Sequence, residues 1–331
     1  MPEFRLSLRW RDRRVRIGLL TAIVLAALAY PGVSLVVAER LTKPYRRPLA
    51  SSPAVFGLDY EDVTFPSAVD AVPLRGWFLP VAASGRVVVI VHGRNSNRTG
   101  DDGQLVPHAE ALVERGYNVL LFDFRAHGES GGVRYTLGAA EQRDVLGAVA
   151  YLEGRGFTAD RTGFWAHSMG AATVLLTAAA LDEVRAIVAD SSFARLGDLL
   201  AEELPRASGL PGYFNPPILF LARALFGVDT TVVNPVDAVS ALPPDSLFII
   251  HAEADGLIPV DHARRIAAAA GPAVHDLWIF PGGRHDRVSA AAPDQYRERV
   301  LAFFDEKLPV MGGVGAPSAH PGGPEAGRDP T

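Results

Sequence analysis

The feature that most constrains this chain is an alternation of short apolar runs with alanine-rich segments of helical spacing. The apolar runs, which we expect to form strands, lie at 86–92, 117–123, 162–167, 184–190, 246–251 and 275–281. The segments with helical composition lie at 104–115, 138–153, 169–181, 261–271 and 292–307. Several runs are almost entirely apolar, which is typical of parallel strands covered on both faces. The alternation therefore predicts an α/β fold, with a mostly parallel central sheet flanked by helices.

The stretch 193–245 interrupts this alternation. It contains seven prolines and lies between two expected strands. Because a structureless loop of that length is rare in a compact domain, we predict a small helical cap insertion there. Two further strands, near 58–65 and 73–80, are expected to pair antiparallel ahead of the sheet. The whole domain should span 54–308, and the Gly- and Pro-rich segment 309–331 should be a disordered tail.

The amino-terminal part contains a run of 22 residues, 17–38, without a charged side chain. As a helix at about 1.5 Å per residue it would be roughly 33 Å long, enough for one bilayer crossing. Six arginines precede the run within 1–16, and four basic residues follow it within 39–53. The positive-inside rule then predicts a basic cytoplasmic tail (1–16), a transmembrane helix, a linker (39–53) and an extracytoplasmic domain.

Two other interpretations of the apolar run stay open. The sequence from Ala27 to Ala29 resembles a signal-peptidase site, so the domain could be secreted after cleavage. The run could also be a buried core helix. Nine apolar or small residues continue beyond Ala29, more than a signal peptide needs, and this favours the membrane anchor.

Composition excludes several classes of protein. The 331 residues include no cysteine, which rules out disulfide frameworks, cysteine zinc sites and thiol nucleophiles. A net charge of −5 argues against a nucleic-acid partner. The sequence has no G-x-G-x-x-G after a strand and no metal-ligand spacing of His, Asp and Glu. We therefore expect neither a cofactor nor a metal.

The strongest chemical signal is the sequence AHSMG at 166–170, between an expected strand and an expected helix. This context is that of a nucleophile elbow, in which a tight turn raises a serine hydroxyl above the sheet. The usual pattern is G-x-S-x-G, and Ala166 takes the place of its first glycine. Ser168 is accordingly the candidate nucleophile.

Further motifs stand in a recognisable order around this elbow. They are His92-Gly93, the run from Asp123 to Ser130, the run from Asp190 to Phe193, the run from Asp255 to Pro259, and the run from Gly282 to His285. With them, residues 55 to 308 resemble the alpha/beta-hydrolase superfamily, in its serine aminopeptidase and monoacylglycerol-lipase-like branch. The triad order of such enzymes is Ser, acid, His, which Ser168, Asp255 and His285 satisfy.

The resemblance also implies a role for each residue. His285 would take the proton of Ser168 and later pass it to the leaving group, while Asp255 would hold the imidazole in the required tautomer. Backbone N–H groups of Arg94 and Met169 would form the oxyanion hole.

Other acids and histidines compete for these roles. Asp261 is better explained as a charge at the start of a helix, and Asp286 directly follows the base. We interpret the remaining histidines as structural or surface residues, with His92 and His127 shaping the oxyanion loop. His167, beside the nucleophile, is interpreted as a packing residue.

The predicted function is a membrane-anchored serine hydrolase that cleaves carboxylic esters, lipid or acyl esters among them, through an acyl-enzyme. The apolar cap stretch 218–226 could line an acyl site or reach the bilayer, or could bury one face on the sheet. One alternative is a serine aminopeptidase-like peptidase in which Asp198, Glu202 or Glu203 binds a substrate amino terminus. An alternative of another class is a catalytically inactive, membrane-tethered binding module.

Overall fold

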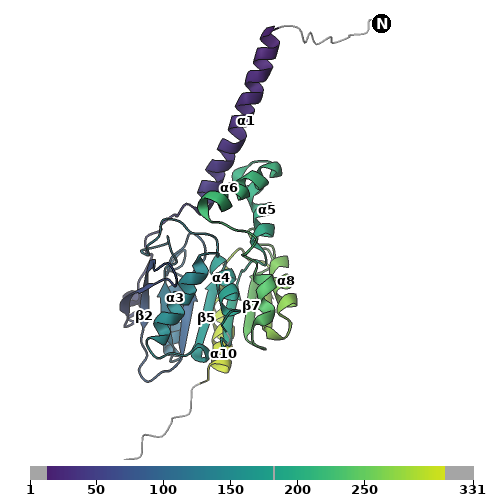
Figure 1. The fold of residues 1–331 in the computed structure, drawn as a ribbon. Helices are drawn as coiled ribbons and strands as arrows, with labels where there is room; N and C mark the ends of the chain where they lie inside the picture. Colours follow the sequence, from purple (N-terminus) through teal and green to yellow (C-terminus); the bar gives the residue numbers. More distant parts are fainter. Residues whose placement is uncertain (1–12, 182, 310–331) are drawn as a thin grey trace, which may run out of the picture.

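Eight strands form one sheet in the computed structural model, which describes residues 13–181 and 183–309 (Figure 1). Their order across the sheet is β1-β2-β4-β3-β5-β6-β7-β8. β1 pairs antiparallel with β2 and β2 with β4, whereas all other neighbours are parallel. The bounds are β1 Glu61–Pro66, β2 Pro73–Leu79, β3 Val87–Val91, β4 Asn118–Phe122, β5 Thr162–His167, β6 Ala186–Asp190, β7 Leu247–Ala252 and β8 Val274–Phe280. The predicted parallel sheet with an antiparallel lead-in is confirmed.

Helices cover both faces of this sheet. On one face lie α3 (Glu141–Glu153), α4 (Met169–Ala178) and α8 (Asp261–Ala270), and on the other lie α2 (Leu105–Glu114) and α10 (Pro293–Lys307). A short helix, α9 (Val288–Ala291), precedes α10. The central strand β3 shows why the apolar runs lack alternation. Val87, Val89 and Val91 enter one core, while Val88 and Ile90 enter the other, so every position is buried.

The insertion after β6 is helical, as predicted. It contains α5 (Leu196–Ser208), the 3₁₀ turn η3 (Gly212–Phe214), α6 (Asn215–Phe226) and α7 (Pro235–Ala238). Helices α5 and α6 lie above the sheet, at the base of the long amino-terminal helix (Figure 1). We call α5, η3 and α6 the cap.

Helix α1 (Arg13–Thr42) extends the predicted span at both ends and projects from the rest of the molecule (Figure 1). By length and composition it could cross a membrane. Its buried residues are Ser34, Ala38, Leu41 and Thr42, which share one face and pack against the cap, chiefly α6. Residues 1–12 of the predicted amino-terminal tail and residues 310–331 of the predicted carboxyl-terminal tail lie outside the described residues.

The segment that follows α1 is hydrogen-bonded to the loops after β3 and β4. The Arg46 guanidinium donates to the carbonyl oxygens of Gly128 (2.9 Å), Ser130 (2.6 Å) and Gly132 (2.9 Å). The Asn97 side-chain amide donates to the carbonyl of Pro48 (3.1 Å). The predicted linker is therefore held along the surface of the domain, at the edge where the strands end.

Candidate active site

Ser168 stands in the turn between β5 and α4, with φ 52° and ψ −121°. A non-glycine residue rarely adopts a positive φ, so this is a strained turn that its neighbours hold in place. One such restraint is the Ser168 N–H, which donates to the carbonyl of Asp190 (2.8 Å). A Cβ on Gly170 would overlap the carbonyl oxygen of His92, so α4 can approach β3 only with glycine there. Ala166 is fully buried in β5, and the turn forms without the usual first glycine.

Three loops bring Ser168, Asp255 and His285 together. Ser168 follows β5, Asp255 follows β7, and His285 follows β8. These strands are parallel, so the loops after their carboxyl ends meet at one edge of the sheet. Ser168 and His285 are 117 residues apart in the sequence, so it is the fold that brings them together.

The three side chains form one continuous hydrogen-bonded chain. His285 Nε2 lies 2.9 Å from Ser168 Oγ, and His285 Nδ1 lies 2.7 Å from Asp255 Oδ2. The second carboxylate oxygen, Oδ1, accepts the N–H groups of Leu257 (2.8 Å) and Ile258 (2.9 Å). Two fixed backbone donors thus orient the carboxylate, which in turn orients the imidazole. This is the nucleophile, base and orienting-acid geometry of acyl transfer.

The charges around His285 favour its protonated form. Burial disfavours a charged ring, but the hydrogen bond and the charge of Asp255 outweigh it, with Asp286 and Asp190 adding to the effect. The pKa of His285 is therefore raised above its usual value of 6.5. A base of this kind would be strengthened for proton transfer from a hydroxyl.

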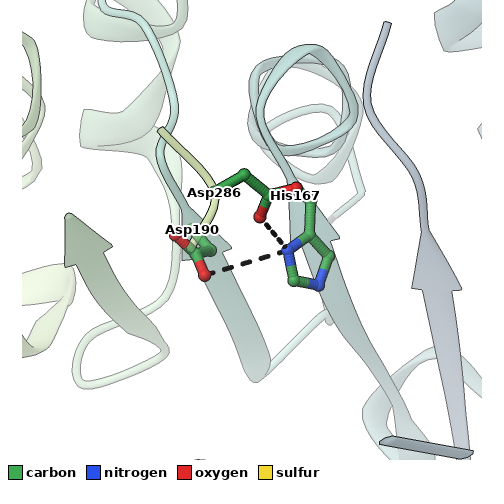
Figure 2. Close-up of side chains that lie close together, drawn as sticks. All are labelled: His167, Asp190 and Asp286. Atoms are coloured by element: carbon green, nitrogen blue, oxygen red, sulfur yellow. Dashed lines mark hydrogen bonds and ion pairs between the residues drawn. The ribbon is translucent and has the colours of Figure 1, made fainter. Parts of the chain in front are cut away.

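The rival acids lie elsewhere. Asp261 opens α8, as the sequence suggested, where it faces the positive end of the helix dipole. Asp286 points toward His167, whose Nδ1 lies 2.8 Å from its Oδ1 (Figure 2). Asp255 is thus the acid that contacts the base.

The rival histidines have other hydrogen-bond or ring partners, and the Nε2 of one of them, His251, also lies 3.4 Å from Asp255 Oδ2. Their partners are the Ile258 carbonyl for His251 (2.8 Å), the Ala194 N–H for His262 (3.0 Å), the Asp245 carboxylate for His275 (2.9 Å) and the Trp165 ring for His108 (4.4 Å between centroids).

The two candidate oxyanion donors flank the nucleophile. Met169 is the first residue of α4, so its N–H has no acceptor within the helix. A Cβ on Gly93 would lie 3.1 Å from the Cβ of Ser168, so the loop bearing Arg94 passes directly beside the serine. Arg94, Ser168 and Met169 line the same cavity. The oxyanion role of the two N–H groups stays a prediction.

Two neutral histidines hold this loop. His92 donates from Nδ1 to the Gly93 carbonyl (2.7 Å) and accepts the Phe124 N–H at Nε2 (3.0 Å). A carbonyl can only accept and an amide N–H can only donate, so the ring carries one proton. Burial accordingly lowers the pKa of His92 to about 4. His127 accepts the Asn95 N–H (3.3 Å), and burial lowers the pKa of this ring to about 3.

A buried cluster beside the site was not foreseen from the sequence. Figure 2 shows His167 facing Asp286 and, 3.8 Å from its Nδ1, Asp190. The Tyr296 hydroxyl donates to Asp190 (2.7 Å), and so does the Ser191 hydroxyl (2.8 Å). His167 is therefore more than a packing residue, because it ties the loop that carries His285 to the strand that carries the nucleophile.

The pKa directions within this cluster indicate where its charge lies. Burial opposes the charge on His167, but Asp286 outweighs it and raises the pKa of the ring. Burial also opposes the charge on Asp286, yet His167 lowers the pKa of that carboxyl. Burial and the neighbouring Asp286 raise the pKa of Asp190. His167 and Asp286 thus form an ion pair next to the catalytic candidates.

The same cluster has the donor types of a metal site. One ligand atom each of His167, Asp190 and Asp286 lies within 4.8 Å of the others. However, the oxygens of Asp190 already accept two hydroxyls and Asp286 already accepts His167, so protein donors satisfy the carboxylates. A second group, Asp245 with His275 and Glu306, lies at the surface, where Lys307 also binds its aspartate. The expected absence of a metal stays a prediction.

A cavity of about 330 Å³ opens above Ser168. Its lining is mostly apolar and includes Arg94 of the loop after β3, residues of the cap helix α5 and, unexpectedly, residues at the carboxyl end of α1. The α5 residues include Leu196, Leu199, Leu200 and Leu204, and the α1 residues are Val37, Arg40 and Leu41. This size is within the usual range of small-molecule sites.

The structure changes two expectations about the cap. Among the described residues, none from the apolar stretch 218–226 lines the cavity, and α6 buries Ile218 and Ala222 in packing against α1 rather than against the sheet. Of the acids considered for binding an amino terminus, Asp198 pairs with Arg265 (2.6 Å). Glu203 does line the cavity, where it also pairs with Arg206 (2.7 Å).

Comparisons with known proteins agree with this architecture. Residues 86–233 match a family model described as alpha/beta hydrolase fold. The chain is 28% identical over 236 residues to the uncharacterized protein YqkD of Bacillus subtilis strain 168, covering 70% of this chain and 75% of the relative. It is also 28% identical over 251 residues to the uncharacterized protein YfhR of Escherichia coli strain K12, covering 74% and 80%.

Among solved structures, the esterase Pf2001 of Pyrococcus furiosus is similar, with a TM-score of 0.67 at 28% identity. The alignment covers 82% of this chain and 100% of the esterase. The likeness therefore extends over most of this chain and all of the esterase.

Proposed function

We propose, from the alpha/beta-hydrolase fold that this chain has, that it is a serine hydrolase cleaving carboxylic esters through an acyl-enzyme at Ser168. The observation that carries the proposal is the unbroken chain from Ser168 Oγ through the His285 ring to Asp255, with contacts of 2.9 and 2.7 Å. This geometry lets His285 take the proton of the Ser168 hydroxyl while Asp255 holds the ring in the tautomer that can accept it.

The reaction would proceed in two halves. His285 Nε2 takes the proton of Ser168 as Oγ attacks the ester carbonyl, and the same proton passes to the departing alcohol. Water then attacks the acyl-enzyme while His285 takes one of its protons; the bond to Ser168 Oγ breaks, the proton passes from His285 to Oγ, and the carboxylic acid leaves. The N–H groups of Met169 and Arg94 would stabilise the negative oxygen in both halves, and one such donor is typically worth about 100- to 1000-fold in turnover.

We further propose that α1 anchors the enzyme in a membrane, with the domain outside the cytoplasm. The apolar length of α1 supports the anchor, and the basic residues at its two ends support the orientation. Protease treatment of intact cells tests the orientation. Digestion of the domain is expected, and a protected domain would reverse the topology.

Labelling with a fluorophosphonate probe tests the nucleophile. The wild type should be labelled and Ser168→Ala should not. Ser192→Ala is the control, because this nearby hydroxyl is buried and donates to the Phe193 carbonyl (3.3 Å). Absence of wild-type labelling would favour an inactive binding module, and labelling that survives Ser168→Ala would place the nucleophile elsewhere.

A peptidase is the second candidate, and Glu203 in the cavity is the observation that favours it. A carboxylate there could bind a substrate amino terminus. Parallel assays with p-nitrophenyl esters and aminoacyl anilides separate the two activities. Faster cleavage of the anilides would make the peptidase the better description, while the leucine-rich lining leads us to expect faster ester cleavage.

A further inference from the structure

We propose that the cavity above Ser168 takes the acyl chain of a lipid ester that enters from the bilayer, with helix α1 forming one wall of the acyl site. The proposal rests on the proposed ester hydrolysis and specifies its substrate. It also gives α1 a second role, because the helix that would anchor the enzyme becomes part of its substrate site.

The lining of the cavity indicates an apolar ligand held between two helices. Val37 and Leu41 of α1 are four residues apart and so share one face of the helix. Leucines of α5 line the cavity together with them, and Ser168 lines the same cavity. A space bounded mostly by aliphatic side chains, with Ser168 in its lining, fits a hydrocarbon chain whose ester carbonyl reaches this serine.

The wall supplied by α1 is fixed to the catalytic loops. The Arg94 guanidinium donates to the Tyr135 hydroxyl (2.9 Å) and to the carbonyl of Leu41 (3.4 Å), at the carboxyl end of α1. Arg134 donates to the hydroxyl of Thr42 (3.1 Å) in the same turn. Cations at this end of a helix are favoured by its dipole. The end of α1 is thus joined to the residue whose N–H is a candidate oxyanion donor.

The position of this wall along α1 points to the bilayer as the source of the substrate. Val37 lies in the last turn of the charge-free run, where a spanning helix would leave the hydrocarbon. Tyr30, about 10 Å deeper along the helix, donates to the Tyr213 carbonyl of the cap (2.7 Å). Its ring lies 4.8 Å from that of Phe214. The cap therefore contacts α1 within its apolar run, and not only at the end of that run.

The cap continues the apolar surface of α1. The side chains of Tyr213, Phe220 and Leu225 are exposed by 65%, 69% and 57%, and they belong to elements that lie beside α1 (Figure 1). Because the cap packs on the apolar part of α1, a bilayer that surrounds the helix would also meet the cap. The cavity between α1 and α5 would then open where lipid acyl chains are present.

Filling the cavity from the α1 side tests the acyl site. The full chain is reconstituted in phosphatidylcholine vesicles, and kcat/KM is measured for p-nitrophenyl acetate and p-nitrophenyl palmitate. Val37→Trp should lower the palmitate value at least tenfold and change the acetate value less than twofold. Val36→Trp is the matched control, since Val36 is the preceding residue, is 48% exposed and does not line the cavity; it should leave both values unchanged.

The outcomes separate this proposal from the proposed function. A wild type that cleaves neither ester and resists the fluorophosphonate probe would contradict ester hydrolysis itself. A wild type that cleaves both, with Val37→Trp affecting them equally or not at all, would contradict only the acyl site on α1. Selective loss of palmitate cleavage in Val36→Trp as well would also contradict it.

A charge on the exposed cap tests the route from the bilayer. Phe220→Asp should lower cleavage of vesicle-borne palmitate at least tenfold and leave soluble acetate within twofold. Val55→Asp is the control, because Val55 is 74% exposed on a 3₁₀ turn (η1, Pro53–Phe56) outside the cap. If Phe220→Asp lowered palmitate and acetate cleavage equally and also changed the oligomeric state in detergent, the cap would be an interface between copies of the chain. That result would refute the route from the bilayer.

Discussion

Replacing Asp255 by asparagine should leave the fold intact and remove the base. In the wild type, Oδ1 accepts two backbone N–H groups, those of Leu257 and Ile258. A backbone N–H cannot accept a hydrogen bond, so the amide oxygen of the introduced asparagine must take that position. Its NH₂ group then faces Nδ1 of His285. The imidazole then carries its proton on Nε2, so Nε2 can no longer accept the proton of Ser168.

The size of the effect follows from this forced tautomer. Loss of the correct tautomer in a Ser-His-Asp triad lowers kcat by about 10⁴-fold, as the trypsin-type aspartate-to-asparagine change shows. At about 1.4 kcal/mol per tenfold, this corresponds to roughly 5 kcal/mol of transition-state stabilisation. Stability should change little, because the asparagine oxygen keeps both backbone hydrogen bonds.

The assay is kcat for p-nitrophenyl butyrate, together with the second-order rate of fluorophosphonate labelling. Asp261→Asn is the matched control, because Asp261 opens α8 and should keep activity within twofold. Thermal unfolding confirms that both variants are folded. If folded Asp255→Asn kept more than a tenth of the wild-type activity, the tautomer argument would be refuted and Asp255 would not be the orienting acid.

Three other predictions concern the base, its neighbours and the elbow. Because only neutral His285 can accept a proton and its pKa is raised, kcat/KM should fall as the pH drops through a midpoint above 6.5; a midpoint below 6.5 would contradict the charge analysis. His167→Leu should leave the Asp286 carboxylate unpaired and cost about 3 kcal/mol. This corresponds to a fall of roughly 6–12 °C in Tm. Adding Asp286→Asn to His167→Leu should recover part of that Tm, and a double variant whose loss of Tm equals the sum of the two single losses would contradict the ion pair. Gly170→Ala should cost about 1–3 kcal/mol through overlap with the His92 carbonyl, and an unchanged Tm would show that β3 and α4 can separate freely.

Much of the fold was predictable because its signals are local. All six apolar runs became strands. Five of them, β3 to β7, are buried at every position, as strands covered on both faces are, while the edge strand β8 is only partly buried. The positions of Ser168, Asp255 and His285 were predictable for a related reason. Each follows a strand, and parallel strands bring their following loops to one edge.

The parts that could not be predicted depend on contacts between distant segments. His167 and Asp286 are 119 residues apart, and nothing in either local sequence indicates the ion pair. The cap shows the same limit. Its apolar stretch 218–226 suggested a lining for the substrate site, yet the leucines of α5 form that lining and α6 packs on α1. Amphipathic spacing shows that a helix buries one face but does not identify the partner of that face.

The hydrogen bonds of the segment after α1 have a kinetic consequence. A free linker of the ten residues 43–52 would have an end-to-end distance of about 18 Å, so that an attached domain would turn freely above its anchor. Arg46 and Asn97 remove that freedom by fixing the segment to the loops beside the site. If α1 anchors the protein in a membrane as proposed, the domain would meet a lipid substrate by lateral diffusion in one plane and in one orientation. Its rate would then follow the mole fraction of substrate in the lipid surface rather than the concentration in the surrounding volume.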